Sequence, residues 1–206
     1  MLRGCAHGDL HGRNILVGIV RDRVLWPTVF DYEDMRPDNL IAWDFVKLES
    51  ELKVRACSEI FARQEPQFLH QVRDFEIQLN EQTERHHLDH TWPLVQNDAE
   101  PAERLRAILL ELRRMAALHL GIYRGRPNQW LEEYYFVLAG YAVSTARFSN
   151  LERRELLAAY VSAGVAVSRL PTRTARPKGN PPSSPFTQTV CGSKWCGSCI
   201  ASTGLT

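Results

Sequence analysis

Three residues near the start of the sequence, Asp9, Asn14 and Asp31, carry the side chains that phosphoryl transfer requires. A carboxylate can orient an acceptor hydroxyl and take its proton late in the reaction. Amide and carboxylate oxygens are the hard ligands that Mg²⁺ prefers. Asp9 is therefore the candidate catalytic base, and Asn14 and Asp31 are the candidate metal ligands.

The residues between Asn14 and Asp31 predict a β-hairpin. Two apolar, strand-like runs, 15–20 and 24–30, flank the polar residues 21–23. A hairpin of this length returns the chain to the point where it began. We therefore expect Asp31 to lie beside Asn14.

This arrangement resembles the aminoglycoside and choline phosphotransferase family, whose members are relatives of the protein kinases. The resemblance lies in the string His7-Gly8-Asp9-Leu10-His11, in the following Asn14-Ile15-Leu16-Val17, and in an apolar strand that ends at Asp31. The interval from Asp9 to Asn14 is the D-x4-N interval of the kinase catalytic loop. Together these motifs cover about the first 33 residues.

The resemblance implies a role for each of these residues. Asp9 corresponds to the catalytic base, and Asn14 and Asp31 correspond to the two metal-binding positions. His7 corresponds to the scaffold histidine of the loop, and both His7 and His11 are assigned to the cofactor-binding part of the site. The implied cofactors are Mg²⁺ and ATP or GTP, and the implied substrate is a small molecule with an acceptor hydroxyl.

The sequence departs from that family before the catalytic loop. It contains neither a G-x-G-x-x-G loop nor a Walker-type G-x-x-x-x-G-K motif, and only six residues precede His7. We therefore expect a catalytic lobe without its N-terminal half. Such a lobe would be inactive alone and would be completed by a missing segment or by a partner protein.

Two other functions remain open. The first is a catalytically inactive interaction module, which would expose a large apolar face. The second is a metal-dependent phosphohydrolase, because Gly8-Asp9-Leu10-His11-Gly12 also resembles the first metal motif of calcineurin-type phosphatases. The later G-D-x-x-D-R-G and Asn-His motifs of those enzymes are absent, so this function would need further ligands converging on Asp9 and His11.

The composition is that of an ordinary globular protein. The chain has 206 residues, 44% hydrophobic and 24% charged, with a formal net charge of +1. No basic stripe indicates nucleic-acid binding, and no segment reads as a signal peptide or membrane span. We expect a cytoplasmic protein in which Cys5 and Cys57 are reduced and mostly buried.

After Asp31 the sequence predicts a loop and then a helix. Glu33 and Asp34 read as solvated charges, with contact to a cationic acceptor as the alternative, and residues 36–39 read as loop. From Trp43 to Ile60 the apolar residues recur at helical spacing, with Lys47, Glu49, Glu51 and Lys53 between them. In the resembling family an aspartate at about the position of Asp44 braces the catalytic loop, and we assign Asp44 that structural role.

A second helix is expected from Pro66, with Phe68, Val72, Phe75 and Leu79 on one face. Residues 80–98 are expected to be a long connection and the place for an acceptor-binding insertion. The histidines in it, His86 and His90, are expected to be exposed loop residues. The alternative is a zinc pair on one face of a helix.

Three further helices are expected, at residues 100–124, 128–148 and 152–170. In the first, an apolar stripe lies opposite Arg106, Arg113 and Arg114. The second is rich in core aromatics, and its end at residues 145–150 resembles phosphotransferase-like domains of the ternary complex-associated group in bacterial conflict systems. The predicted fold is α+β, mostly α, with a helical bundle stacked under the hairpin.

Residue 171 marks the predicted domain boundary. Residues 1–170 form the expected catalytic lobe. Residues 171–206 are rich in Pro and Ser and predict a disordered tail. Cys191, Cys196 and Cys199 in this tail read as exposed thiols, with a zinc or redox site as the alternative.

Overall fold

The computed structural model describes residues 1–21, 23–89, 99–121, 125, 129–145 and 147–171. The described part consists of five α-helices and two separate two-stranded antiparallel sheets. This confirms the α+β, mostly α, fold class. The predicted tail from 172 onward, with its three cysteines, lies outside the described residues.

The first sheet pairs β1 (Arg3–Ala6) with β4 (Arg36–Leu40). The prediction of a loop at 36–39 was therefore wrong. Pro37 punctuates a loop in most sequences, but a proline is also tolerated in an edge strand, and β4 has only β1 as a neighbour. The pairing joins Arg3 to Leu40 across the whole hairpin segment, a contact that local sequence patterns do not encode.

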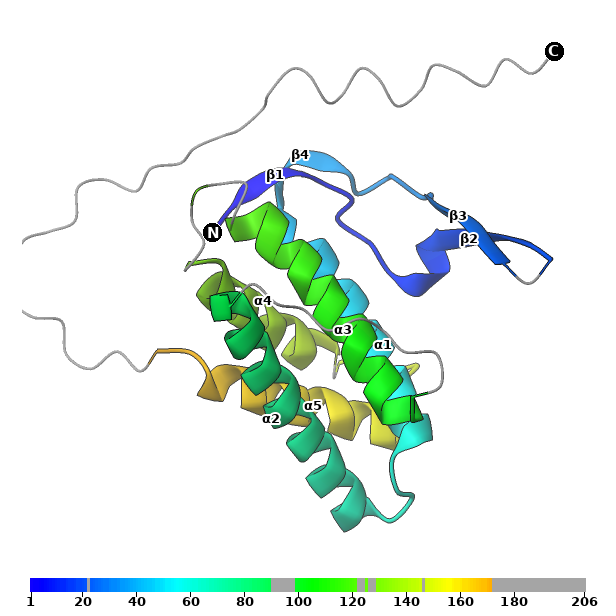
Figure 1. Cartoon of the computed structure of the whole chain (residues 1–206), viewed down its shortest axis with the longest axis vertical. Helices are drawn as coiled ribbons and strands as arrows, with labels where there is room; N and C mark the ends of the chain where they lie inside the picture. Colours follow the sequence, from blue (N-terminus) through cyan, green and yellow to red (C-terminus); the bar gives the residue numbers. More distant parts are fainter. Residues whose placement is uncertain (22, 90–98, 122–124, 126–128, 146, 172–206) are drawn as a thin grey trace, which may run out of the picture.

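The second sheet is the predicted hairpin of β2 (Ile15–Val20) and β3 (Arg23–Val29). The expectation that the helices stack under it was wrong, because the hairpin projects away from the helical body (Figure 1). Its apolar side chains are consequently exposed, with Ile19 at 64% and Val24 at 67%. The β1–β4 sheet, not the hairpin, packs on the helices.

The helices are α1 (Ile41–Ile60), α2 (Glu65–Asp89), α3 (Pro101–Ala116), α4 (Trp130–Thr145) and α5 (Arg153–Ser168). A short 3-10 turn, η1 (Gly12–Asn14), precedes β2, and a π-helical segment, η2 (Ala117–Gly121), extends α3. Helix α1 packs against α3, α4 and α5, so it is covered on several sides. None of the helices in the described ranges is long and apolar enough to cross a bilayer.

Helix α2 is longer than predicted. Its apolar stripe of Phe68, Val72, Phe75 and Leu79 is buried as expected, but the helix continues to Asp89, so the prediction of a connection from residue 80 was wrong. The polar residues Asn80 and Thr83 are fully buried against Arg113 rather than exposed in a loop. Helical hydrogen bonding continues there because tertiary partners satisfy these side chains.

The two described histidines of this segment are likewise not loop residues. His86 and His87 lie in α2, and the indole N–H of Trp130 donates to Nδ1 of His87 at 2.9 Å. His90, the second member of the alternative zinc pair, lies outside the described residues.

Several charged residues expected on helix surfaces are buried instead. Glu49, Lys53 and Arg113 are at most 2% exposed. Arg113 donates to both carboxylate oxygens of Glu49, and Lys53 lies 2.9 Å from Glu49 and 2.9 Å from Glu76. These charges stay in the core because each has a partner of opposite sign from another helix or the next helical turn.

The two described cysteines, Cys5 and Cys57, differ in their exposure to solvent. Cys57 is buried, as predicted, whereas Cys5 is exposed on β1, so that part of the prediction was wrong. The strand alternation of β1 turns Gly4 and Ala6 inward and Arg3 and Cys5 outward. Burial raises the pKa of the Cys57 thiol to about 12.

Candidate functional site

The loop that carries Asp9 is held by Asp44 from the first turn of α1. Asp44 Oδ2 accepts the backbone N–H of His7 at 2.6 Å, and Oδ1 accepts that of Gly8 at 2.8 Å. Burial raises the pKa of this carboxyl, and the hydrogen bonds from the His7, Gly8 and Leu10 amides act in the opposite direction. The predicted bracing role of Asp44 is therefore confirmed.

His7 links the loop to Phe30, the residue that follows strand β3 of the hairpin. Its Nε2 lies 2.8 Å from the carbonyl oxygen of Phe30, and its Nδ1 accepts the backbone N–H of Asp9 at 3.3 Å. A carbonyl can only accept a hydrogen bond, so Nε2 is the donor in the contact with Phe30 and Nδ1 is the acceptor in the contact with Asp9. The two ring nitrogens thus join the loop to the residue that follows β3, and the scaffold role of His7 stays a prediction.

Gly8 lets the chain pass close to the segment after the hairpin. Its φ is +84°, and a Cβ at this position would lie 2.5 Å from the carbonyl oxygen of Asp34. A left-handed conformation and a backbone neighbour so close are compatible with glycine alone. The glycine therefore fixes the position of Asp9, the next residue.

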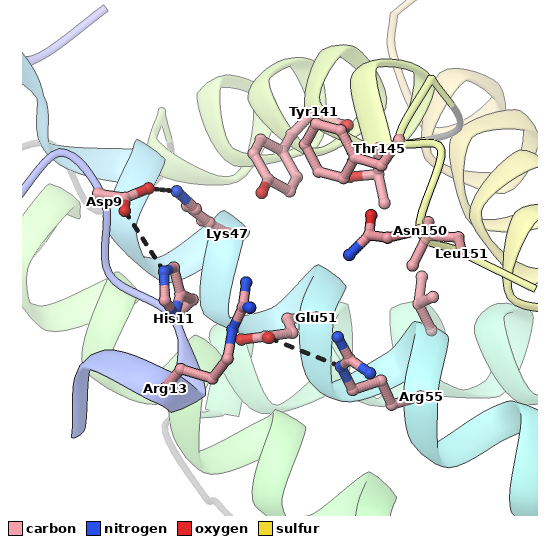
Figure 2. Close-up of a pocket in the computed structure, with 12 residues that line it drawn as sticks. Asp9, His11, Arg13, Lys47, Glu51, Arg55, Tyr141, Thr145, Asn150 and Leu151 are labelled. Carbon is pink, nitrogen blue, oxygen red and sulfur yellow. Dashed lines mark hydrogen bonds and ion pairs between the residues drawn. The ribbon is translucent and has the colours of Figure 1, made fainter. Parts of the chain in front are cut away.

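The carboxylate of Asp9 lies among three polar side chains, two of which, Lys47 and His11, are drawn in Figure 2. Lys47 of α1 pairs with Oδ1, His11 Nε2 lies 3.3 Å from Oδ2, and Asn14 Nδ2 lies 3.5 Å from the same oxygen. Burial lowers the pKa of the Lys47 ammonium. Asp9 is thus held in one orientation by a cation on one side and by loop residues on the other.

Asn14 and Asp31 lie at the two ends of the hairpin, where the strands begin and finish. Asn14 is buried, and the N–H of Phe30 donates to its carbonyl at 3.1 Å. The Asn14 side chain donates from Nδ2 to the carbonyl oxygen of Asp9 at 3.1 Å, which leaves its Oδ1 available. Asp31 follows Phe30 directly, at a φ of +64°, a conformation that aspartate tolerates better than most residues.

One face of α1 supplies, beside Asp44, two residues whose contact with the loop was not predicted, Lys47 and Glu51. Asp44, Lys47 and Glu51 are three and four residues apart, so they lie on the same side of the helix. Glu51 Oε2 accepts the N–H of Gly12 at 2.6 Å, and all three side chains therefore contact the 7–12 loop. The signal was available: once Asp44 is assigned to brace the loop, residues at i+3 and i+7 must face the same loop.

A cavity of about 240 Å³ opens beside Asp9. Its walls come from the 9–13 loop, from α1 and from the end of α4 with the residues that follow it. Glu33 and Asp34, which the sequence offered as contacts for a cationic acceptor, are not among the residues that line this cavity.

The model of the family described as ternary complex associated domain 9 matches residues 1–147. The chain belongs to this family. The matched residues of the ternary complex associated domain include the whole 7–14 loop, Asp31, the hairpin, and helices α1 to α4. The weaker of the two sequence resemblances thus agrees with the family, while the likeness to kinases stays a prediction. No curated protein and no solved structure matches the chain.

The metal ligands that this ternary complex associated domain offers are few. No group of three or more His, Cys, Asp or Glu that could hold a metal occurs among the residues that the structure describes. The phosphohydrolase alternative needs further ligands that converge on Asp9 and His11, and the described residues do not supply them. Magnesium in nucleotide sites commonly takes only one or two protein oxygens, with phosphates and water as the other ligands. Asn14 Oδ1 and the Asp31 carboxylate fit that smaller requirement.

Proposed function

We propose that this domain binds a magnesium nucleotide at the 7–14 loop and transfers its terminal phosphoryl group to an acceptor hydroxyl. The observation that supports this best is the hydrogen bond from Asn14 Nδ2 to the Asp9 carbonyl. This bond commits the amide nitrogen to Asp9, the residue proposed as base, so the amide oxygen is the atom of Asn14 that remains to bind a metal. In such an arrangement the amide oxygen of Asn14 would bind the metal that holds the phosphate, while the carboxylate of Asp9 would orient the acceptor hydroxyl.

On this proposal each residue has a distinct task. Asp9 accepts the proton of the acceptor hydroxyl while the acceptor oxygen bonds to the terminal phosphorus and the nucleoside diphosphate leaves. Lys47 holds the Asp9 carboxylate and donates to the oxygens of the transferring group. Asn14 and Asp31 would hold the magnesium ion, which when bound offsets the negative charge of the phosphates.

A partner protein is part of the proposal, because the family to which this chain belongs is described as associated with a ternary complex. The hairpin is the surface suited to such a partner, since it projects from the body directly beside Asn14 and Asp31 (Figure 1). A segment docked on it would cover the nucleotide. The same exposed hairpin favours a second candidate function, an inactive interaction module.

The register of the hairpin indicates which edge a partner strand would use. Asn14 and Phe30 form a hydrogen-bonded pair, so by alternation Val17 and Pro27 form a non-hydrogen-bonded pair. The ring of Pro27 therefore occupies the outer edge of β3, where it blocks strand addition. The outer edge of β2 keeps its backbone donor at Val17.

Titration calorimetry with Mg²⁺-ATP tests the proposal. We expect saturable binding that is lost in Asn14→Ala and in Asp31→Ala and retained in the control Asp38→Ala, an exposed residue of β4. Absence of binding by the unsubstituted chain at millimolar nucleotide would reject the phosphotransferase proposal and leave the interaction module.

A further inference from the structure

The cavity beside Asp9 has an excess of positive charge. Arg13, Lys47 and Arg55 face two carboxylates, those of Asp9 and Glu51. Lys47 is committed to Asp9, and Glu51 accepts the short hydrogen bond from the Gly12 amide. One positive charge therefore remains without a matching carboxylate in the wall.

Of the three cations in the wall, Arg13 and Arg55 are the two that form no hydrogen bond to a carboxylate among the described residues. Arg13 is exposed and, within the described residues, has no ion pair or hydrogen bond of its own. Arg55 forms two ion pairs, at 3.6 Å with Glu51 and at 3.9 Å with Glu155, and both distances are too long for a hydrogen bond, so its N–H groups can still donate to a ligand. Both guanidinium groups line the same cavity as Asp9 (Figure 2). A carboxylate that entered the cavity could replace solvent around them with bidentate hydrogen bonds.

Apolar side chains line part of the cavity, beside the polar Thr145 and Asn150. They are Val54 of α1, Phe148 and Leu151 after α4, and the buried ring of Tyr141. Phe148 is 47% exposed, so part of its surface is available to a ligand. The cavity thus combines a cationic side, an apolar side and the carboxylate of Asp9, which suits an organic molecule better than a bare inorganic ion.

We propose that this cavity binds a small hydroxy acid, with its carboxylate on Arg13 and Arg55, its apolar body on Phe148 and Leu151, and its hydroxyl toward Asp9. The single excess positive charge matches a monoanionic carboxylate rather than a phosphate, which carries between one and two negative charges at neutral pH. The role of the hydroxy acid rests on the proposed function, in which this ligand is the phosphoryl acceptor. Its binding is testable without any nucleotide.

Calorimetry with two matched probes tests the charge preference. The probes are 3-phenyllactate and 3-phenylpropane-1,2-diol, which differ in having a carboxylate or a neutral hydroxymethyl group. We expect phenyllactate to bind at least about tenfold more tightly, the effect of one charged contact of roughly 1.4 kcal/mol. Equal binding of the two probes would overturn the proposal, as would inorganic phosphate that binds more tightly than phenyllactate.

Substitutions assign the effect to the cavity. Arg13→Gln and Arg55→Gln should each reduce the preference for phenyllactate, and the double variant should abolish it. Arg23→Gln, on the far end of the hairpin, is the matched control and should leave it unchanged. Both cavity arginines are exposed or half-exposed, so the variants should fold, which far-UV circular dichroism checks. A preference that survives in the double variant would overturn the assignment.

A second readout separates this inference from the proposed function. The side-chain Nε–H resonances of Arg13 and Arg55 should shift on addition of phenyllactate in the absence of nucleotide and magnesium. If they shift and Mg²⁺-ATP does not bind, the hydroxy-acid site stands and only phosphoryl transfer is rejected. If Mg²⁺-ATP binds and they do not shift, the proposed function stands and the acceptor class is wrong.

Discussion

Arg113 of α3 and Glu49 of α1 form a bidentate ion pair in which neither side chain has any exposed surface. Nε lies 2.9 Å from Oε2 and Nη2 lies 2.6 Å from Oε1. Tyr134 donates to the same carboxylate at 2.6 Å, and Asn80 and Thr83 accept from the guanidinium. The pair therefore links α1, α2, α3 and α4 at one point.

Removing the cation of this pair should be costly. Arg113→Met leaves the Glu49 carboxylate buried with Lys53 as its remaining cationic partner, and we expect a loss of about 3–5 kcal/mol in the free energy of unfolding. The neighbouring Arg114→Met removes the partly exposed pair with Glu111 and should cost about 0–1 kcal/mol. Urea unfolding of both variants measures the difference. Similar small losses in the two variants would contradict the central role of Arg113.

The same ion pair should make the free energy of unfolding depend on pH in the acidic range. The Arg113 and Lys53 charges hold the pKa of Glu49 well below its ordinary value of 4.5 against the opposing effect of burial. As the pH falls below about 4.5, the unfolded chain binds a proton that the folded chain does not, so the free energy of unfolding decreases. Urea unfolding between pH 7 and pH 3 checks this.

Two variants isolate the contribution of Glu49 to the pH dependence. Glu49→Gln should be less stable at pH 7 but show a shallower decline below pH 4.5, because the titrating group is gone. Glu65→Gln, which removes an exposed carboxylate of α2, should keep most of the decline. A decline that is equally steep in Glu49→Gln would locate its origin elsewhere.

The Asp44 carboxylate should be needed for the 7–14 loop more than for the helix that carries it. Asp44→Ala leaves the amides of His7 and Gly8 without their acceptor, and we expect a loss of about 2–3 kcal/mol. Amide hydrogen exchange should accelerate at these two residues. Asp38→Ala is the control, since its side chain is exposed. Unchanged exchange in Asp44→Ala would show that the loop is held by other contacts.

The two described cysteines should differ in reactivity. The thiolate is the nucleophile, and burial raises the pKa of Cys57 to about 12, whereas Cys5 is exposed. Iodoacetamide at pH 8 should therefore modify Cys5 and spare Cys57 in the folded protein, and modify both in urea. Peptide mass spectrometry measures the two sites separately. Rapid modification of native Cys57 would contradict its burial.

The hairpin should tolerate polar substitution without loss of stability. Val24 is 67% exposed and Val54 is 4% exposed, so the same change to serine compares a hairpin position with a core position. We expect Val24→Ser to change the free energy of unfolding by less than about 0.5 kcal/mol and Val54→Ser to lower it by about 2 kcal/mol. A large loss in Val24→Ser would mean that the hairpin packs on the body in solution.

The sequence alone determined those features that depend on local patterns. The strands β2 (Ile15–Val20) and β3 (Arg23–Val29) follow, with small differences in their ends, from the apolar runs 15–20 and 24–30 around a polar turn. The buried stripe of α2 follows from residues three and four apart. The bracing role of Asp44 also came from its position relative to a recognised loop, and contact with the His7 and Gly8 amides confirms it.

Only the tertiary structure decided how the charged residues are used. Glu49 and Arg113 are 64 residues apart, and each reads by itself as a surface charge on an amphipathic helix. They are buried because α1 is covered on several sides, so that its polar positions meet complementary groups on other helices. Lys47 differs from them, because its spacing from Asp44 places it on the side of α1 that faces the loop, but its pairing with Asp9 is seen only in the folded chain. Whether a charged residue is buried, and which group it pairs with, depends on residues that are far away in the sequence. Helical spacing alone does not reveal either.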